Sequence, residues 1–191
     1  MADEDGSDHQ QNCRLLALPG ELKNRIYRLV LVQPEDTPII ITSTGYHRGG
    51  GLLQTCEQVR REALKIFFYE NEFEHPLRRW NPTPMCNFMS TIARLELDCP
   101  KAEMVYEVPI EPCWRHLVQW CCQIHKGVLT SDVINPGALR KEDVLDLQTH
   151  MVAMMMLTVR TMCSQPWSLV EELLEGMRPS LITADRRWED D

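Results

Sequence analysis

The 191-residue sequence contains no apolar run long enough to cross a membrane. Its longest uninterrupted apolar stretch covers six residues, 152–157, whereas a spanning helix needs roughly 20. We therefore predict no membrane segment. A chain of this length can still bury a core without disulfides or metals.

The sequence contains cysteines but lacks a paired cysteine motif. The eight cysteines are spread from Cys13 to Cys163 and form no Cys-x-x-Cys motif. Residues 1–13 are polar and acidic, and they lack the basic start and apolar core of a secretory signal. We expect reduced thiols and a cytoplasmic or nuclear location.

Basic residues are in deficit. The 20 Lys and Arg side chains face 28 Asp and Glu side chains, which gives a formal net charge of −8. Proteins that bind nucleic acid normally carry a basic surplus. We expect no nucleic-acid partner, and the absence of a membrane segment gives no membrane partner.

Catalytic and cofactor motifs are also missing. The sequence has no G-x-S-x-G elbow, no H-E-x-x-H pair and no complete phosphate-binding motif. The glycine cluster Gly45, Gly49, Gly50 and Gly51 falls between a predicted strand and a helix, where we expect a flexible connector. Weak anion binding at that helix start is the alternative. We predict no catalytic residue, no cofactor and no small-molecule ligand.

Four residues have the types that bind zinc: Cys113, His116, Cys121 and His125. On a single helix the first and last would lie about 18 Å apart, whereas zinc ligands converge within a few ångströms. We expect the cysteines to be small core side chains. No metal site is predicted.

A first helix is predicted to start at Pro19, because a missing N–H costs nothing in a first helical turn. Leu22, Ile26, Leu29 and Val30 then recur at the spacing of one helical face. This face is the first candidate for either core packing or an interaction.

A strand and a second helix follow. The β-branched run at residues 39–42 predicts a short, well-buried strand. The second helix is predicted to be strongly amphipathic, because apolar residues recur by four and three. They are Leu52, Cys56, Val59, Ala63, Ile66 and Phe67.

Two further segments predict strands. Residues 71–75 begin at Asn71 and are followed by Pro76, and both of these residues are expected to interrupt a helix. We therefore expect residues 71–75 to form an edge strand. Residues 93–99 alternate apolar and charged side chains, which is typical of a half-buried strand. Together with residues 39–42 they predict a small sheet.

The C-terminal half is predicted to be helical. One stripe contains Trp114, Leu117, Val118, Cys121 and Ile124 and ends near Gly127. A second contains Val144, Leu147, Met151, Met154, Met155 and Met162; its methionines are typical of a core or of an adaptable groove, and we favour the core. A last helix is predicted from Pro166, with Val170, Leu173, Leu174 and Met177 facing inward.

These patterns predict an α+β fold, a predominantly helical single domain with a small two- to four-stranded sheet. Residues 14–183 would form the domain, in which 76–110 bear strands and 111–183 are helical. Residues 1–13 and 184–191 are predicted to be acidic tails, the first of them disordered.

Two segments carry a family resemblance: LALPGELKNRIYRLVLV at residues 16–32 and GLLQTCEQVRREALKIFFYENEF at residues 51–73. They resemble the F-box-like domain of a large group of fungal proteins named for repeated Glu-x-Arg motifs. The match is clear over residues 14–75, the signature region, and it continues more faintly into residues 92–100 and the tryptophan-bearing helices. In that family the first segment resembles the opening helix of an F-box, which docks substrate adaptors onto the Skp-type subunit of cullin ubiquitin ligases.

The resemblance implies a partner-docking face made of Leu18, Pro19, Leu22, Ile26 and Leu29. It implies a non-enzymatic protein–protein interaction module that acts as a substrate adaptor. The alternative function is a fungal scaffold protein unrelated to ubiquitin, and an enzyme is the least favoured. The sequence departs from the pattern at Lys23, where the family usually has Arg, and in the strand and glycine loop that separate the two segments.

The same first helix has a purely structural alternative. Its apolar face would pack against Val59, Ala63 and Phe67 and form an ordinary two-helix core. The exposure of Leu18, Pro19 and Leu22 distinguishes the two hypotheses, because a docking face has to be open to solvent.

Overall fold

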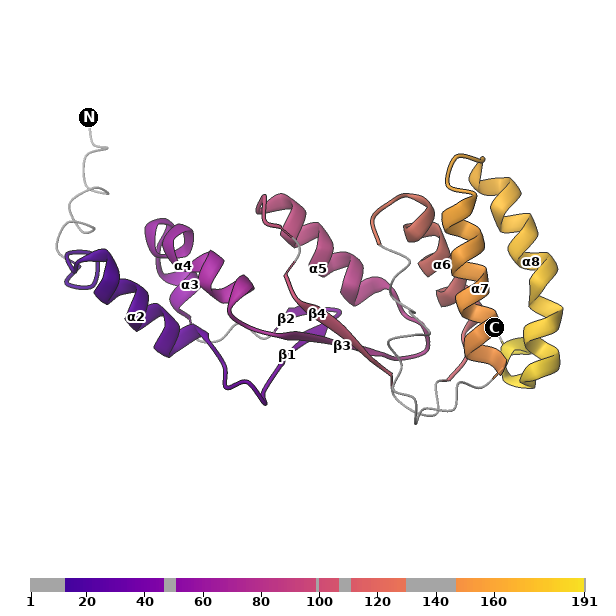
Figure 1. Ribbon diagram of the computed structural model, residues 1–191, viewed down its shortest axis with the longest axis horizontal. Helices are drawn as coiled ribbons and strands as arrows, with labels where there is room; N and C mark the ends of the chain where they lie inside the picture. The colour runs from indigo at the N-terminus through magenta and orange to yellow at the C-terminus, as the bar shows by residue number, and fades with distance from the viewer. Residues whose placement is uncertain (1–12, 47–50, 99, 107–110, 130–146, 191) are drawn as a thin grey trace, which may run out of the picture. The chain divides into compact units, whose positions relative to one another are not determined.

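The computed structural model describes residues 13–46, 51–98, 100–106, 111–129 and 147–190 (Figure 1). The helices are α2 (Gly20–Leu31), α3 (Leu52–Thr55), α4 (Glu57–Tyr69), α5 (Thr83–Arg94), α6 (Trp114–His125), α7 (Leu147–Thr161), α8 (Trp167–Ala184) and the short 3₁₀ helix η2 (Arg186–Glu189). The strands are β1 (Ile39–Thr42), β2 (Gly45–Tyr46), β3 (Phe73–Leu77) and β4 (Ala102–Tyr106). The predicted class is confirmed: the fold is α+β, mainly helical with a small sheet.

The sheet has four strands in the order β2-β1-β3-β4. β1 and β3 are parallel, with Ile39 opposite Phe73 and Ile40 opposite Glu74. Parallel neighbours need a long crossover, and α3 and α4 supply it here. The strand predicted at 71–75 is therefore real, but it is not an edge strand, and Pro76 lies inside it.

β1 was expected to be well buried throughout, and the structure corrects this. Ile39 and Ile41 are buried, whereas Ile40 is 41% exposed. Successive side chains of a strand point to opposite faces, so only one face of β1 is covered. The β-branched run correctly predicted a strand, but only one of the two faces of that strand is buried as expected.

The strand predicted at residues 93–99 is wrong within its described residues, 93–98. α5 continues to Arg94, and the Leu95 N–H then bonds to the Thr91 carbonyl at 3.0 Å, so the segment is a helix end followed by a turn. α5 itself was missed because its prolines looked like breakers. Pro82 and Pro84 instead occupy the start of the helix, where proline is tolerated.

The chain divides into two compact units, and the first contains Met1–Ile40, Tyr46–Glu74 and Pro100–Glu103. In this unit α2 and α3 each pack against α4. Three aromatic rings form the core beside Tyr27 and Leu31. Phe67 meets Phe68 edge-on at 5.1 Å between ring centroids, and Phe68 stacks on Phe73 at 5.8 Å.

The second predicted helix is divided in the structure. Cys56 has extended backbone angles, φ −153° and ψ 165°, so α3 ends before it and α4 begins after it. Its Sγ accepts a hydrogen bond from the Val59 N–H at 3.5 Å and caps α4. The inward face of α4 is as predicted, because Val59, Ala63 and Phe67 are buried.

The second unit contains Ile41–Gly45, His75–Cys99 and Met104–Asp191. In it α6, α7 and α8 pack against one another, and α7 and α8 lie side by side (Figure 1). The α6 stripe is largely confirmed, since Trp114, Leu117 and Cys121 are buried, whereas Val118 is half-buried. Gly127 follows the helix with φ +71°, the left-handed conformation in which a helix often ends.

The predicted inward face of α7 is confirmed only in part, because Met155 is buried as expected but two other members of the stripe are exposed. Leu147 is 67% exposed and Met154 is 61% exposed, whereas Val152, Met156 and Val159 are buried. The apolar run at 152–157 covers more than one side of a helix, so its periodicity does not identify the inner side. Val144 lies outside the described residues.

The prediction for α8 is partly confirmed. Val170 and Leu174 are buried as expected, but Leu173 is 39% exposed, and Leu181 is buried one turn beyond the predicted stripe. Pro179 lies inside the helix without ending it.

The segment predicted as an acidic C-terminal tail is folded where the structure describes it. Trp188 in η2 is fully buried, and its indole N–H donates to the Gln148 amide oxygen at 2.9 Å. The Asp185 carboxylate accepts from the Arg187 backbone N–H at 3.0 Å and caps η2. Burial of one large aromatic side chain therefore holds this segment in a folded conformation within the second unit, although the residues around it are acidic.

We expect Trp188→Ala to lower the free energy of unfolding by about 3–5 kcal/mol, the usual range for deleting a buried aromatic side chain. Trp188→Phe should cost about 1–3 kcal/mol, because it leaves the buried Gln148 amide without its donor. Urea denaturation measures both, with the exposed Glu189→Ala as the control. An unchanged unfolding midpoint for Trp188→Ala would contradict this account of η2.

Candidate protein-docking helix

The helix α2 has one apolar side that is open to solvent. Leu29 is 80% exposed, Leu22 is 49% exposed and Val30 is 43% exposed. Ile26 is half-buried between them. Positions 22, 26 and 29 follow the spacing of neighbours on one helical face, so these side chains form a continuous outward stripe.

The rest of the predicted docking face lies at the start of α2. Pro19 is exposed and precedes the helix as its N-cap residue, and Leu18 is half-buried. The docking face, defined as Leu18, Pro19, Leu22, Ile26 and Leu29, is therefore open at Pro19, Leu22 and Leu29.

The structural alternative for this face fails at Leu22, Leu29 and Val30, which are exposed, whereas Ile26 is half-buried. Val59, Ala63 and Phe67 of α4 are buried, but the α2 side chains buried in the same unit are Tyr27 and Leu31. Leu22, Leu29 and Val30 take no part in that core. The spacing of Tyr27 and Leu31 by four residues was a usable signal, but the longer aliphatic stripe concealed it.

A carboxylate on α4 holds the inner side of α2. The Lys23 ammonium and the Tyr27 hydroxyl each donate to Glu62 at 2.9 Å, and the Gln58 amide donates to it at 3.0 Å. The hydrogen bond from Lys23, followed by those from Gln58 and Tyr27, lowers the pKa of Glu62 to about 2. Burial, reinforced by the contact with Glu62, raises the pKa of Tyr27 to about 12.

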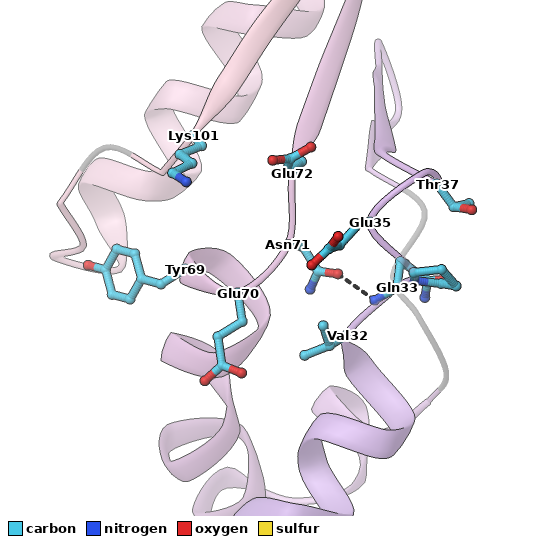
Figure 2. Close-up of a pocket in the computed structure, with 10 residues that line it drawn as sticks. Val32, Gln33, Glu35, Thr37, Tyr69, Glu70, Asn71, Glu72 and Lys101 are labelled. Carbon is cyan, nitrogen blue, oxygen red and sulfur yellow. Dashed lines mark hydrogen bonds between the residues drawn. The ribbon is translucent and has the colours of Figure 1, made fainter.

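Two further contacts fix the C-terminal end of α2. The Arg28 guanidinium donates to both oxygens of Glu70, at 2.8 Å and 2.9 Å. Asn71 is 4% exposed; its amide group donates to the carbonyls of Leu31 at 3.0 Å and Phe67 at 2.8 Å. Figure 2 shows the third bond of Asn71, in which its side-chain oxygen accepts from the Gln33 N–H at 2.7 Å.

Sequence reasoning missed these polar contacts. The sequence patterns mark Asn71 as a breaker and Lys23 only as a departure from the usual Arg, and they do not single out Glu62. In the structure the Lys23 side chain is only 13% exposed. All three act across the junction of α2 and α4, and one helix by itself gives no signal for a contact with another.

A pocket of about 320 Å³ opens beside the end of α2 (Figure 2). Its lining includes the carboxylates of Glu35, Glu70 and Glu72 and the ammonium of Lys101. Glu70 is held by Arg28, and the buried Asn71 already uses its amide in three hydrogen bonds. The charged groups that remain in the lining, Glu35, Glu72 and Lys101, are exposed, so we do not place chemistry in this pocket.

The zinc-type residues are separated into structural roles. Cys113 and Cys121 are buried. The His116 Nδ1 lies 2.9 Å from the Arg79 carbonyl, and the His125 Nε2 lies 2.8 Å from the Gln165 carbonyl. No cluster of three or more His, Cys, Asp or Glu side chains suited to a metal occurs in the described parts of the chain.

The glycine cluster is described only in part, because Gly49 and Gly50 lie outside the described residues. Gly45 belongs to β2, with φ +114°, so this end of the expected connector is a strand. Gly51 precedes α3, whose four residues give too short a helix for an anion site at its start.

Comparisons with protein-family models, curated proteins and solved structures found no match for this chain. Among the described helices, none combines the length and the apolar composition that a membrane crossing requires.

We expect Asn71→Ala to lower the free energy of unfolding by about 2–4 kcal/mol, because each buried backbone group left unsatisfied costs about 1–3 kcal/mol. Asn71→Asp should lose at least as much, since a carboxylate cannot donate to the two carbonyls. Urea denaturation measures the change, with the exposed neighbour Glu72→Ala as the control. A loss below about 0.5 kcal/mol for Asn71→Ala would show that water satisfies these groups.

The Glu62 contacts should make stability depend on pH in one direction. The folded-state pKa of about 2 lies below the ordinary value of 4.5, so the stabilisation is complete above 4.5 and is lost as pH falls toward 2. Glu62→Gln should therefore be less stable than the wild type near neutral pH, and the difference should shrink in acid. Chemical denaturation at several pH values from about 7 to about 3 measures this difference.

Glu57→Gln removes an exposed carboxylate from the same helix and serves as the matched control for that experiment. A gap between wild type and Glu62→Gln that stays constant down to about pH 3 would contradict the assignment.

Proposed function

We propose that this chain is a non-enzymatic protein-interaction module that binds a partner through the docking face of α2. The exposure of Leu22 and Leu29 carries the proposal. Covering a Leu side chain contributes about 1.5–3 kcal/mol, and a few such side chains supply much of the energy of a typical interface. The polar contacts of Glu62 and Asn71 hold α2 in place before binding, so little ordering cost falls on the association.

The specific partner we propose is the Skp-type subunit of a cullin ubiquitin ligase, with the chain as an F-box-like substrate adaptor. Support comes from the resemblance at residues 16–32, whose implied docking residues include the most exposed leucines of α2. The exposure of the residues at the start of α2 also favours docking. Pro19 and Leu22 are exposed to solvent, and Leu18 is half-buried.

A scaffold protein unrelated to ubiquitin is the second candidate. β1 and β2 lie in the chain between α2 and α3, whereas a genuine F-box joins its helices tightly. The same exposed stripe would then bind a different protein. Both candidates use α2, and the identity of the captured partner separates them.

The test is co-purification of the full chain with a fungal Skp-type subunit. We expect the wild type to capture it stoichiometrically and Leu22→Asp/Leu29→Asp to lose at least about tenfold in affinity, because the exchange removes more than about 1.4 kcal/mol of apolar contact. Circular dichroism checks that the variant remains folded. Both leucines are exposed, so the exchange should leave the core intact.

Leu169→Asp/Leu173→Asp on α8 is the matched control, since it makes the same chemical change at two leucines that are 46% and 39% exposed. An equal loss of affinity in both variants would show that the effect does not depend on α2. Failure of the folded wild type to capture the subunit would reject the adaptor function and leave the scaffold candidate.

A further inference from the structure

The cations of α2 differ in whether the chain itself neutralises them. Lys23 is paired with Glu62 at 2.9 Å, and Arg28 is paired with Glu70 at 2.8 Å. Arg25 is exposed, and its guanidinium has no hydrogen bond or ion pair with any residue in the described ranges. It is the one cation of this helix left without an anion from the described chain.

Arg25 borders the outward stripe. It follows Leu22 by three residues and precedes Leu29 by four, which are the two spacings that make side chains neighbours on a helix. Lys23 and Arg28 are instead drawn toward α4 by their carboxylates. The edge of the docking face therefore carries a positive charge beside its two most exposed leucines.

Glu21 is the nearest candidate for an internal partner, because it precedes Arg25 by four residues. The structure shows no ion pair between them, and an exposed pair at this spacing contributes only about 0.3–0.5 kcal/mol. A carboxylate on another protein could displace such a contact easily. Glu21 thus does not neutralise the edge of the stripe.

We infer that the partner presents an apolar surface with an Asp or Glu side chain at its rim, placed to pair with Arg25. The inference rests on the proposed function in that α2 is the docking face. A guanidinium offers two parallel donors to a carboxylate, so the pair would fix the rotation of α2 about its axis as well as add affinity.

The net charge of the chain limits what this pair does. A charge of −8 repels an acidic partner at long range. Arg25 therefore acts after contact, on the register and lifetime of the complex, rather than on the rate of encounter. Its effect should persist at an ionic strength that screens the long-range field.

The test compares Arg25→Glu with Arg61→Glu in binding to the Skp-type subunit at about 0.15 M salt. Arg61 is exposed on α4, two residues from the buried Val59 and so on the side of α4 that faces away from the core. The two variants change net charge equally, so any difference between them is local. We expect Arg25→Glu to weaken binding at least about tenfold more than Arg61→Glu, mainly through faster dissociation.

The carboxylates at the rim of the partner's surface are then changed to Lys one at a time. One of these changes should restore binding of Arg25→Glu, and none of them should restore binding of Arg61→Glu. Equal weakening by the two chain variants would overturn the inference while leaving the docking proposal in place. Absence of binding by the wild type would overturn the inference and reject the adaptor function, and it would leave the scaffold candidate. Self-association of the wild type that Leu22→Asp/Leu29→Asp abolishes, measured by sedimentation, would make a second copy the occupant and overturn the inference.

Discussion

The contact of Tyr27 and Leu31 with the core of the first unit determines which side of α2 meets solvent. Both side chains are fully buried, and α2 packs against α4. A helix has two opposite sides, so burying Tyr27 and Leu31 necessarily turns Leu22 and Leu29 outward. The proposed interaction surface follows from this packing and does not need a separate structural device.

Hydrophobicity by itself does not explain the choice of side. A rotation of α2 by half a turn would bury Leu22 and Leu29, each a full aliphatic side chain, and expose the Tyr27 ring. That arrangement would also separate Lys23 and Tyr27 from Glu62. The hydrogen bonds to one ionised carboxylate are charge-assisted and stronger than neutral ones, so they favour the observed rotation.

The sequence best predicts those elements whose apolar pattern is compatible with only one secondary structure and one buried face. The α6 stripe around Trp114 and Leu117 was predicted correctly because a clean amphipathic run ends at Gly127. The inner side of α7 was predicted only in part, because residues 152–157 are apolar all round. α5 was missed because Pro82 and Pro84 suit a helix start as well as a turn, and nothing local separates the two.

The candidate site was predictable in its apolar part and not in its polar part. The stripe of Leu22 and Leu29 follows from spacing and from the resemblance, although its exposure required the structure. The roles of Glu62 and Asn71 depend on partners about 35 to 40 residues away in the chain. A single sequence has no signal for such pairings, because Glu and Asn side chains are far more often solvated than buried.

A similar limit explains why His75 escaped notice. It lies in β3 at 1% exposure, its ring stacks on Trp120 at 6.1 Å, and burial lowers its pKa below the ordinary value. The fold therefore buries this titratable ring inside the second unit in surroundings that disfavour its charged form, while the charges of α2 in the first unit are paired or left at the surface. Arg25 belongs to the last group, and an unpaired surface cation beside exposed leucines is a combination that folding alone does not require. A partner surface that covers the leucines and supplies a carboxylate would account for both features together.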